Sequence, residues 1–149
     1  TIQKILSESY FDMVIMAAAV SDYSVDHLLY DGEIVAVSQD EKLSSGGSLS
    51  VHLRMNDKIV ERLKAYSLNR AIKVVAFKLT HSLDQESNRH AVSRLLNSTA
   101  IDYVIHNDLH SITEQTHGFS LYGNVGMQFR GDDKRMMAEA LDCVARGIL

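Results

Sequence analysis

Proline and tryptophan are absent from this 149-residue sequence, and cysteine occurs once. Without proline no turn is stiffened by a fixed φ angle, so we expect the long loops to be mobile. The single cysteine, Cys143, excludes an internal disulfide and fits a reducing cytoplasm, where we expect the protein to lie. No apolar run approaches the length needed to cross a bilayer and no signal-peptide pattern is present, so we expect no membrane partner.

Positive charge is also scarce. Fifteen Lys and Arg residues face nineteen Asp and Glu residues, which gives a net charge of −4, and no basic cluster forms a stripe. Neutralising nucleic-acid phosphates requires such a cluster, so nucleic acid is not an expected partner. A hydrophobic content of 46% is ordinary for a globular protein, and the length suits one domain with a sizeable core. We therefore expect a single domain over residues 1–149.

Short apolar and amphipathic segments alternate along the chain. Strands are expected at residues 14–20, 34–38, 48–55, 73–77 and 101–106, and a closing hairpin at 119–129. Helices are expected at residues 57–68, at about 82–96 with Ser82 and Gln85 in capping-box spacing, and from Asp132 or Asp133 to Gly147. This alternation predicts a three-layer α/β domain with a mostly parallel sheet, closed by a C-terminal hairpin plus helix. Cys143 follows the apolar spacing of the last helix and is expected to pack in the core rather than to act as a nucleophile.

The run Val14–Tyr23 contains the most informative pattern. Its unbroken apolar start predicts a strand buried on both faces, and the three alanines Ala17–Ala19 leave the backbone bare where the strand ends. Asp22 follows, in the place where an acidic side chain can bind a ribose hydroxyl or a base amine. The alternative is that the alanines only permit close helix packing and that Asp22 only opens a turn.

Polar groups follow three predicted strands: Asp22, Phe77-Lys78 and Asn107-Asp108. If the strands are parallel, these groups meet at one edge of the sheet, where ligands of α/β proteins bind. Lys42 lies in a polar, glycine-rich segment that follows the first strand end, and it can act as a mobile cation for phosphates. A solvated surface lysine is the plainer interpretation.

Two other kinds of site are disfavoured. His106, His110 and His117 cluster in the sequence, but they straddle a strand end and a loop and lack a neighbouring general-base Glu, so no metal site is predicted. A short-chain dehydrogenase needs Tyr and Lys four residues apart; the nearest pair is Tyr66 and Arg70, and no glycine-rich dinucleotide turn is present.

Several of these segments resemble one family, phosphopantothenate–cysteine ligase. The match begins with Ala17-Ala18-Ala19-Val20-Ser21-Asp22-Tyr23 and Lys42-Leu43-Ser44-Ser45-Gly46-Gly47, and continues through the strand that ends in Arg54-Met55. Val75-Ala76-Phe77-Lys78-Leu79 and Asp102…Asn107-Asp108 resemble two later segments of the family. The similarity runs from about residue 12 to about residue 129.

The resemblance implies a ligase of coenzyme A biosynthesis. The family joins 4′-phosphopantothenate to cysteine through an acyl-nucleotide, using ATP or CTP, with Mg²⁺ expected beside the nucleotide. It also implies a Rossmann-like dimer with a β-hairpin arm. Lys42 would be catalytic through its charge. The positions matching the nucleotide site would be Met16, Ala17, Ala18, Asp22, Lys42, Asp57, Lys58, Ile59, Val60 and Phe77, with Arg94 as a nearby cation.

The chain departs from the family in three ways. Leu95 and Thr99 stand where bacterial members carry two phosphate-binding lysines, and Asp57-Lys58 stands where Pro-Asp is usual. The family's N-terminal Gly-Gly-Thr and Asn…Ser-Ser-Gly segments are not found. We therefore expect the N-terminal part of the domain to be missing, and a homodimer or a complementing chain to cover the exposed sheet edge. The alternative function is a non-catalytic nucleotide-binding or assembly module, one piece of a split enzyme.

Overall fold

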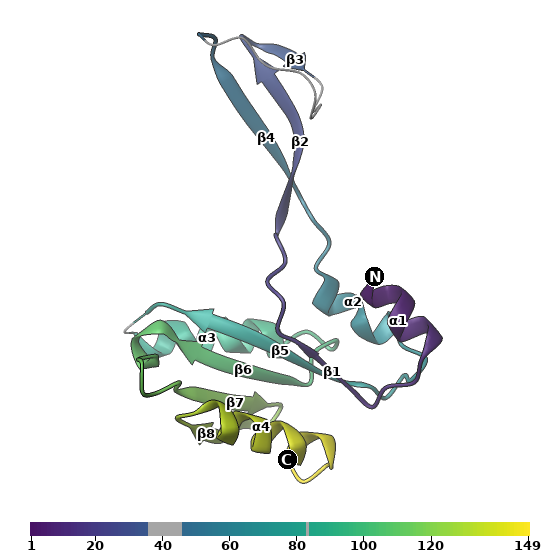
Figure 1. Ribbon diagram of the computed structural model, residues 1–149, viewed down its shortest axis with the longest axis vertical. Helices are drawn as coiled ribbons and strands as arrows, with labels where there is room; N and C mark the ends of the chain where they lie inside the picture. Colours follow the sequence, from purple (N-terminus) through teal and green to yellow (C-terminus); the bar gives the residue numbers. More distant parts are fainter. Residues whose placement is uncertain (36–45, 83) are drawn as a thin grey trace. The chain divides into compact units, whose positions relative to one another are not determined.

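The structure is a computed structural model that describes residues 1–35, 46–82 and 84–149 (Figure 1). The chain forms two compact units. The larger unit comprises Thr1–Ala18 and Ile59–Leu149, and the smaller unit comprises Ala19–Lys58.

The larger unit is built on a mixed five-stranded sheet in the order β1-β5-β6-β7-β8 (Figure 1). Strands β1, β5 and β6 pair in parallel, whereas β6 with β7 and β7 with β8 pair antiparallel, so the sheet is mixed rather than mostly parallel. The elements of this unit are α1 (Ile2–Glu8), β1 (Met13–Met16), α2 (Ile59–Tyr66), β5 (Lys73–Thr80), α3 (Gln85–Leu96), β6 (Tyr103–Asp108), the 3-10 helix η1 (Leu109–Ser111), β7 (Phe119–Gly123), β8 (Gly126–Gly131) and α4 (Lys134–Ala145).

Helices cover both faces of this sheet, which confirms the predicted three layers. Successive residues of β5 point to opposite faces. Val74 lies in a cluster with residues from α1, α2 and α3, whereas Val75 lies in a second cluster with residues from α4. The helical members of the two clusters are Leu6, Leu63 and Val92 on one face, and Met137, Ala140 and Val144 on the other. Burial of these apolar residues, at about 25 cal/mol per Å², is the main stabilising contribution.

Strand β1 is shorter and more exposed than the sequence predicts. It ends at Met16, so the three alanines lie beyond it, and the Ile15 side chain is 42% exposed. The expectation of a strand buried on both faces is therefore wrong. The reason is position: in the described residues β1 pairs only with β5 and forms one edge of the sheet.

The helix caps follow the sequence closely, with one exception. Asp84, not Ser82, caps α3, because its carboxylate accepts hydrogen bonds from the backbone N–H groups of Glu86 and Ser87. The capping box predicted for Ser82 is thus incorrect. Asp133 caps α4, and Gly147 follows that helix with a φ of 73°, a conformation that glycine adopts without steric cost.

The smaller unit is a three-stranded antiparallel sheet in the order β3-β2-β4. Its strands are β2 (Tyr23–Tyr30), β3 (Glu33–Val35) and β4 (Leu49–Met55). Strand β2 is not among the strands predicted from the sequence. The strand predicted at residues 34–38 appears as β3, and its residues 36–38 lie outside the described residues.

One face of this smaller sheet is apolar and exposed. Paired residues of β2 and β4 lie on the same face, and the pairs Tyr23–Met55, Val25–Leu53 and Leu28–Val51 are all apolar or aromatic. Leu53 and Val51 remain 57% and 51% exposed. We call this set of six residues the arm face. A contiguous exposed apolar surface of this kind is typical of an association site.

Candidate functional site

The parallel strands of the larger unit place three strand ends at one edge of the sheet. Strands β1, β5 and β6 run in the same direction, so their last residues, Met16, Thr80 and Asp108, lie toward this carboxyl edge; Thr80 pairs with Asp108, whereas Met16 pairs with Ala76, four residues before the end of β5. Strand β5 continues three residues beyond Phe77, so Phe77 and Lys78 lie inside the strand rather than at its end. Asp108 thus lies at a strand end as predicted and Phe77-Lys78 do not, while Asp22 belongs to the smaller unit, so the predicted meeting of the three groups stays a prediction.

Asp108 is the most highly connected side chain at this edge. Its carboxylate accepts hydrogen bonds from Thr80 Oγ1 at 2.6 Å, Asn88 Nδ2 at 2.9 Å and the backbone N–H groups of Ser82 and His110. These donors, led by the Thr80 hydroxyl, hold the pKa of Asp108 well below its usual value. The carboxylate therefore ties the end of β5, the start of α3 and the end of β6 together.

Three predicted nucleotide-binding residues pack on the same core cluster of the larger unit. Met16, Ile59 and Val60 are half-buried and pack on the core beneath α1, α2 and α3. Ala17 and Ala18 follow Met16 and are exposed, so no bulky side chain covers their backbone. The first residues of α2, Ile59 and Val60, pack on the same core cluster as Met16.

Phe77 and Arg94 are placed differently. Phe77 packs on the opposite face of the sheet, in the cluster beneath α4. Arg94 is exposed in the last turn of α3, about 14 Å along the helix from its start at Gln85. The described larger unit therefore groups neither residue with Met16, Ile59 and Val60.

The remaining predicted residues belong to the smaller unit or lie outside the described residues. Asn56 donates its backbone N–H to the carbonyl oxygen of Asp22 at 2.8 Å, and its side chain bonds Ser21 and Ser24. Asp22 is thereby held next to the segment Asp57-Lys58, which follows Asn56 in the chain. Lys42 lies outside the described residues.

The histidines are engaged in local contacts. His106 is 9% exposed and its Nε2 lies 2.8 Å from Thr80 Oγ1, while burial lowers its pKa. The His110 ring stacks on His81 with centroids 4.6 Å apart, and the backbone N–H of His117 donates to Asp132. Within the described ranges, no three His, Cys, Asp or Glu side chains are arranged to hold a metal ion.

A groove of about 1180 Å³ lies on the sheet face that α3 shares with β6, β7 and β8. Asn88, His106, Ser120, Tyr122 and Arg130 are among its lining residues. Apart from His106, which was weighed only as a metal ligand, sequence reasoning did not single out these residues. Antiparallel pairing of β6, β7 and β8 brings His106, Ser120, Tyr122 and Arg130 together, and no local motif marks such pairing.

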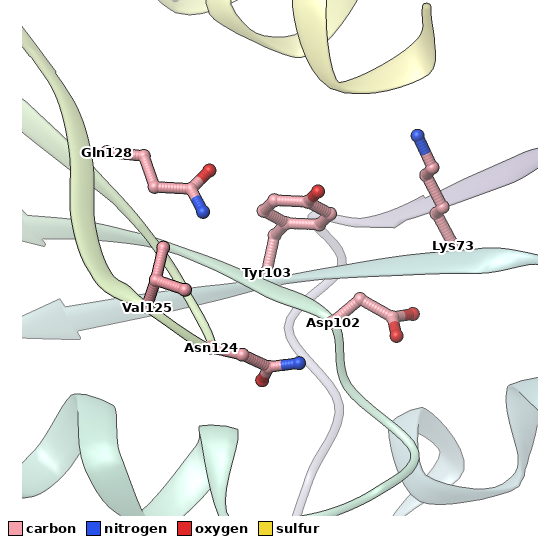
Figure 2. Close-up of a pocket in the computed structure, with 6 residues that line it drawn as sticks. All are labelled: Lys73, Asp102, Tyr103, Asn124, Val125 and Gln128. Carbon is pink, nitrogen blue, oxygen red and sulfur yellow. The ribbon is translucent and has the colours of Figure 1, made fainter. Parts of the chain in front are cut away.

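A second pocket, of about 210 Å³, lies at the amino ends of β5 and β6 (Figure 2). Its polar groups are largely committed to internal bonds. Lys73 Nζ donates to the carbonyl of Val144, Tyr103 Oη donates to that of Leu149, and Asp102 pairs with Lys64 at 2.7 Å. This pocket therefore ties the end of the chain to the sheet, at the edge opposite the candidate nucleotide residues.

Across the described residues, no helix combines the length and the apolar character that crossing a membrane requires.

The fold and its carboxyl-edge site define an α/β protein of a known class. A family model, the C-terminal domain of the DNA/pantothenate metabolism flavoproteins, matches residues 2–148. The chain belongs to this family, which confirms the resemblance found in the sequence.

Two curated relatives carry the name coenzyme A biosynthesis bifunctional protein CoaBC. The protein from Methanocaldococcus jannaschii is 30% identical over 99 residues, which cover 66% of this chain and 21% of the relative. The protein from Thermococcus kodakarensis is 28% identical over 141 residues, which cover 94% of this chain and 32% of the relative. The chain thus spans between about a fifth and a third of the length of these relatives.

Solved structures share the fold. The DNA/pantothenate metabolism flavoprotein from Streptococcus pneumoniae superposes with a TM-score of 0.74 at 20% identity, covering 98% of this chain and 64% of that one. A Cab2 variant in complex with phosphopantothenate-cysteine superposes with a TM-score of 0.53 at 17% identity, covering 70% of this chain and 34% of that one.

Proposed function

We propose that this chain is the nucleotide-binding portion of a phosphopantothenate–cysteine ligase. Membership in the family and the CoaBC relatives support this assignment. The observation that carries it is the exposed pair Ala17 and Ala18, which directly follows the carboxyl end of β1, where Met16 packs on the same core as the first turn of α2. A flat base or ribose can approach such a backbone closely, and ligands of α/β sheets bind at this edge.

The proposed reaction has two steps. The carboxylate of 4′-phosphopantothenate attacks the α-phosphate of a nucleoside triphosphate, forming an acyl-nucleotide and releasing pyrophosphate. The amine of cysteine then displaces the nucleotide and forms the amide. Most of the catalytic effect in such a reaction comes from fixed charges and dipoles that stabilise the developing negative charge.

Each candidate residue has a role in this proposal. The Met16–Ala18 backbone and Asp22 would hold base and ribose, and Lys42 would neutralise the phosphates. The first turn of α2, at Ile59 and Val60, offers backbone N–H groups for an anion. Asp57, Lys58, Phe77 and Arg94 retain the supporting roles that the resemblance gives them, although Phe77 and Arg94 lie away from the Met16 group.

Mg²⁺ would accompany the triphosphate. Magnesium prefers oxygen ligands and is bound mainly through one or two carboxylates and the substrate phosphates. Asp22 and Asp57 fit this requirement, since Asn56 bonds the backbone of Asp22 and is the direct neighbour of Asp57. When bound, the ion would offset phosphate charge.

A substitution at Ala17 tests the proposed role of the bare backbone. In the full-length protein, Ala17→Leu should weaken nucleotide binding at least tenfold, since the new side chain would occupy the space above the backbone. Ala138→Leu, on the exposed side of α4, is the matched control and should bind as the parent does.

The readout is exchange of labelled pyrophosphate into the nucleotide, measured with phosphopantothenate and without cysteine. The proposal requires exchange in the parent, a deep loss in Ala17→Leu and no change in Ala138→Leu. If the full-length parent shows no exchange with either nucleotide, the ligase assignment is wrong.

We propose ATP rather than CTP as the nucleotide. The choice rests on the segment Ser44-Ser45-Gly46-Gly47 and on Leu95 and Thr99, which stand where bacterial members of the family carry two phosphate-binding lysines. Competition binding of CTP against ATP tests it. A tenfold preference for CTP, about 1.4 kcal/mol, would reverse the choice.

A non-catalytic binding module is the second candidate. Leu95, at a position where bacterial members of the family carry a phosphate-binding lysine, packs instead against the apolar core beneath α3. The carbonyl of Thr99, at the other such position, accepts a hydrogen bond from Lys64. Nucleotide binding without pyrophosphate exchange in the full-length protein would favour this function over the ligase.

A further inference from the structure

His106 is a buried imidazole to which the proposed reaction gives no role so far. It lies on β6, two residues before the carboxyl end of that strand, and is 9% exposed. It also lines the groove of about 1180 Å³ on the α3 face of the sheet. An ionisable side chain with a perturbed pKa that lines a groove is a candidate for chemistry as well as for packing.

Hydrogen bonding fixes which ring nitrogen of His106 carries the proton. The Thr80 hydroxyl has one hydrogen, which it donates to the Asp108 carboxylate at 2.6 Å. The 2.8 Å contact between Thr80 Oγ1 and His106 Nε2 therefore runs from Nε2–H to the hydroxyl oxygen. In the neutral ring, Nδ1 then carries the lone pair.

The lone pair of Nδ1 is open to a proton from outside the protein. Among the described residues Nδ1 has no hydrogen-bond partner, and it is not one of the buried polar atoms that are closed off without one. The Tyr122 ring meets the imidazole edge-on, with ring centroids 6.4 Å apart. A molecule in the groove can therefore reach Nδ1 of His106.

The surroundings of His106 keep its ring neutral. Burial lowers its pKa below the ordinary value; the Asp108 carboxylate opposes this shift, and the Lys78 ammonium adds to it. The other charged residues that line the groove, within the described part of the chain, are Arg89, Arg130 and Asp132. A neutral imidazole in a fixed tautomer can act as a base at neutral pH.

His106 lies on the same sheet face as Met16, the last residue of β1. Met16 pairs with Ala76, and both belong to the core cluster that contains Val104, two residues before His106. Two strand spacings and a rise of two residues place the Cα atoms of Met16 and His106 about 12 Å apart. An acyl-nucleotide whose base and ribose lie at Met16–Ala18 can extend its acyl carbon toward His106.

We propose that His106 is the general base of the second step, in which cysteine displaces the nucleotide; this inference rests on the proposed function. As the cysteine nitrogen bonds to the acyl carbon, the nitrogen becomes strongly acidic, and Nδ1 takes its proton. The bond from the acyl carbon to the phosphate oxygen breaks, and the nucleoside monophosphate leaves with the electron pair. Asp108, through Thr80, is a positioning residue that stabilises the imidazolium, which then returns the proton to water.

A single-turnover measurement on the full-length protein separates the two steps. The protein is loaded with phosphopantothenate and the nucleotide that supports pyrophosphate exchange, cysteine is added, and amide formation is followed by quenched flow. His106→Gln should slow amide formation by at least about a hundredfold, because general-base catalysis contributes that much, and should leave pyrophosphate exchange unchanged. His110→Gln, which replaces an exposed histidine just beyond β6, is the matched control and should leave both steps unchanged.

The pH dependence of amide formation distinguishes a base from a structural residue. Cysteine attacks as the neutral amine, so its rate falls about tenfold per pH unit in acid, and protonation of a second group steepens the fall toward about a hundredfold. The parent should show this steepening below the folded pKa of His106, and His106→Gln should not.

Three results would overturn the role of His106: amide formation by His106→Gln at the rate of the parent, an equal loss of exchange and amide formation, or the same pH slope in both proteins. A full-length parent without any exchange would instead contradict the proposed function, and this inference with it.

Discussion

Thr80 and Asp108, the last residues of the neighbouring parallel strands β5 and β6, are joined by a 2.6 Å hydrogen bond from the hydroxyl to the carboxylate. The register places the two residues directly opposite each other. This contact joins the carboxyl ends of β5 and β6. The same hydroxyl oxygen accepts a hydrogen bond from His106 Nε2–H, which fixes the tautomer of that ring. Asn88 extends the network into α3 by donating to the same carboxylate. The Asp108 side chain thus connects the end of β5, the end of β6 and helix α3.

Replacing Asp108 by Asn should destabilise the protein by about 1–3 kcal/mol, because partly buried donors would lose their charged acceptor. Urea unfolding measures the change. Thr80→Val should show a smaller loss, and the double variant should deviate from additivity by about 0.5–3 kcal/mol, since the two residues are in contact. Asp142→Asn, which removes an exposed bridge to Arg146, should change stability by no more than about 0.5 kcal/mol. Strict additivity of Thr80→Val and Asp108→Asn would contradict the coupling.

Burial of His106 should make stability depend on pH. Its pKa in the folded chain lies below the ordinary value of 6.5, so the unfolded chain binds more protons and stability rises with pH. As far as this histidine is concerned, the free energy of unfolding is highest above pH 6.5. It declines as the pH falls below that value toward the folded pKa, with a slope of up to about 1.4 kcal/mol per pH unit.

Urea unfolding between pH 7.5 and 5 should therefore show a steeper loss of stability in the parent than in His106→Gln. His90→Gln, which replaces an exposed histidine of α3, should follow the parent. Parallel curves for the parent and His106→Gln would mean that the ring is not held neutral.

Substitution of the two aspartates that precede α4 tests which of them caps the helix. The sequence left Asp132 and Asp133 as equal candidates, and the Asp133 carboxylate accepts the backbone N–H of Met136 at 2.7 Å. Asp133→Ala should therefore cost about 1 kcal/mol of unfolding free energy. Asp132→Ala should cost much less, because Asp132 contributes its backbone carbonyl, which alanine keeps. Equal losses in thermal unfolding would refute the assignment of the cap.

The arm face should mediate self-association. Its apolar pairs are exposed, and we propose that a second copy of the chain covers them, as expected from the family resemblance. Sedimentation velocity at micromolar concentration should show a dimer. Val51→Lys with Leu53→Lys should shift the protein to monomer, whereas Ser50→Lys, on the other face of β4, should not. A parent that sediments as a monomer would exclude association through this face.

The sequence by itself determined the local and periodic features of this protein. Alternation of apolar segments predicted the α/β layers, since burial on two faces needs helices on both sides of the sheet. Turn residues placed the closing hairpin and the end of the last helix at Gly147. Short motifs such as Ala17–Ala19 with Asp22 were enough to indicate the family, because their residues follow one another within a single stretch of chain and can be read without the tertiary structure.

The tertiary structure decided the features that depend on which strands lie next to one another, such as exposure and cross-strand pairs. Ile15 is exposed because β1 is an edge strand, and Phe77 lies on the opposite sheet face from Met16 because side chains alternate along β5. The row of His106, Ser120 and Arg130 exists only because His106 pairs with Ser120 and Ser120 with Arg130 across neighbouring strands, and no periodicity within a segment encodes such a register. Sequence patterns report which face of an element is apolar, whereas the side chains that meet across strands follow from how the whole sheet assembles.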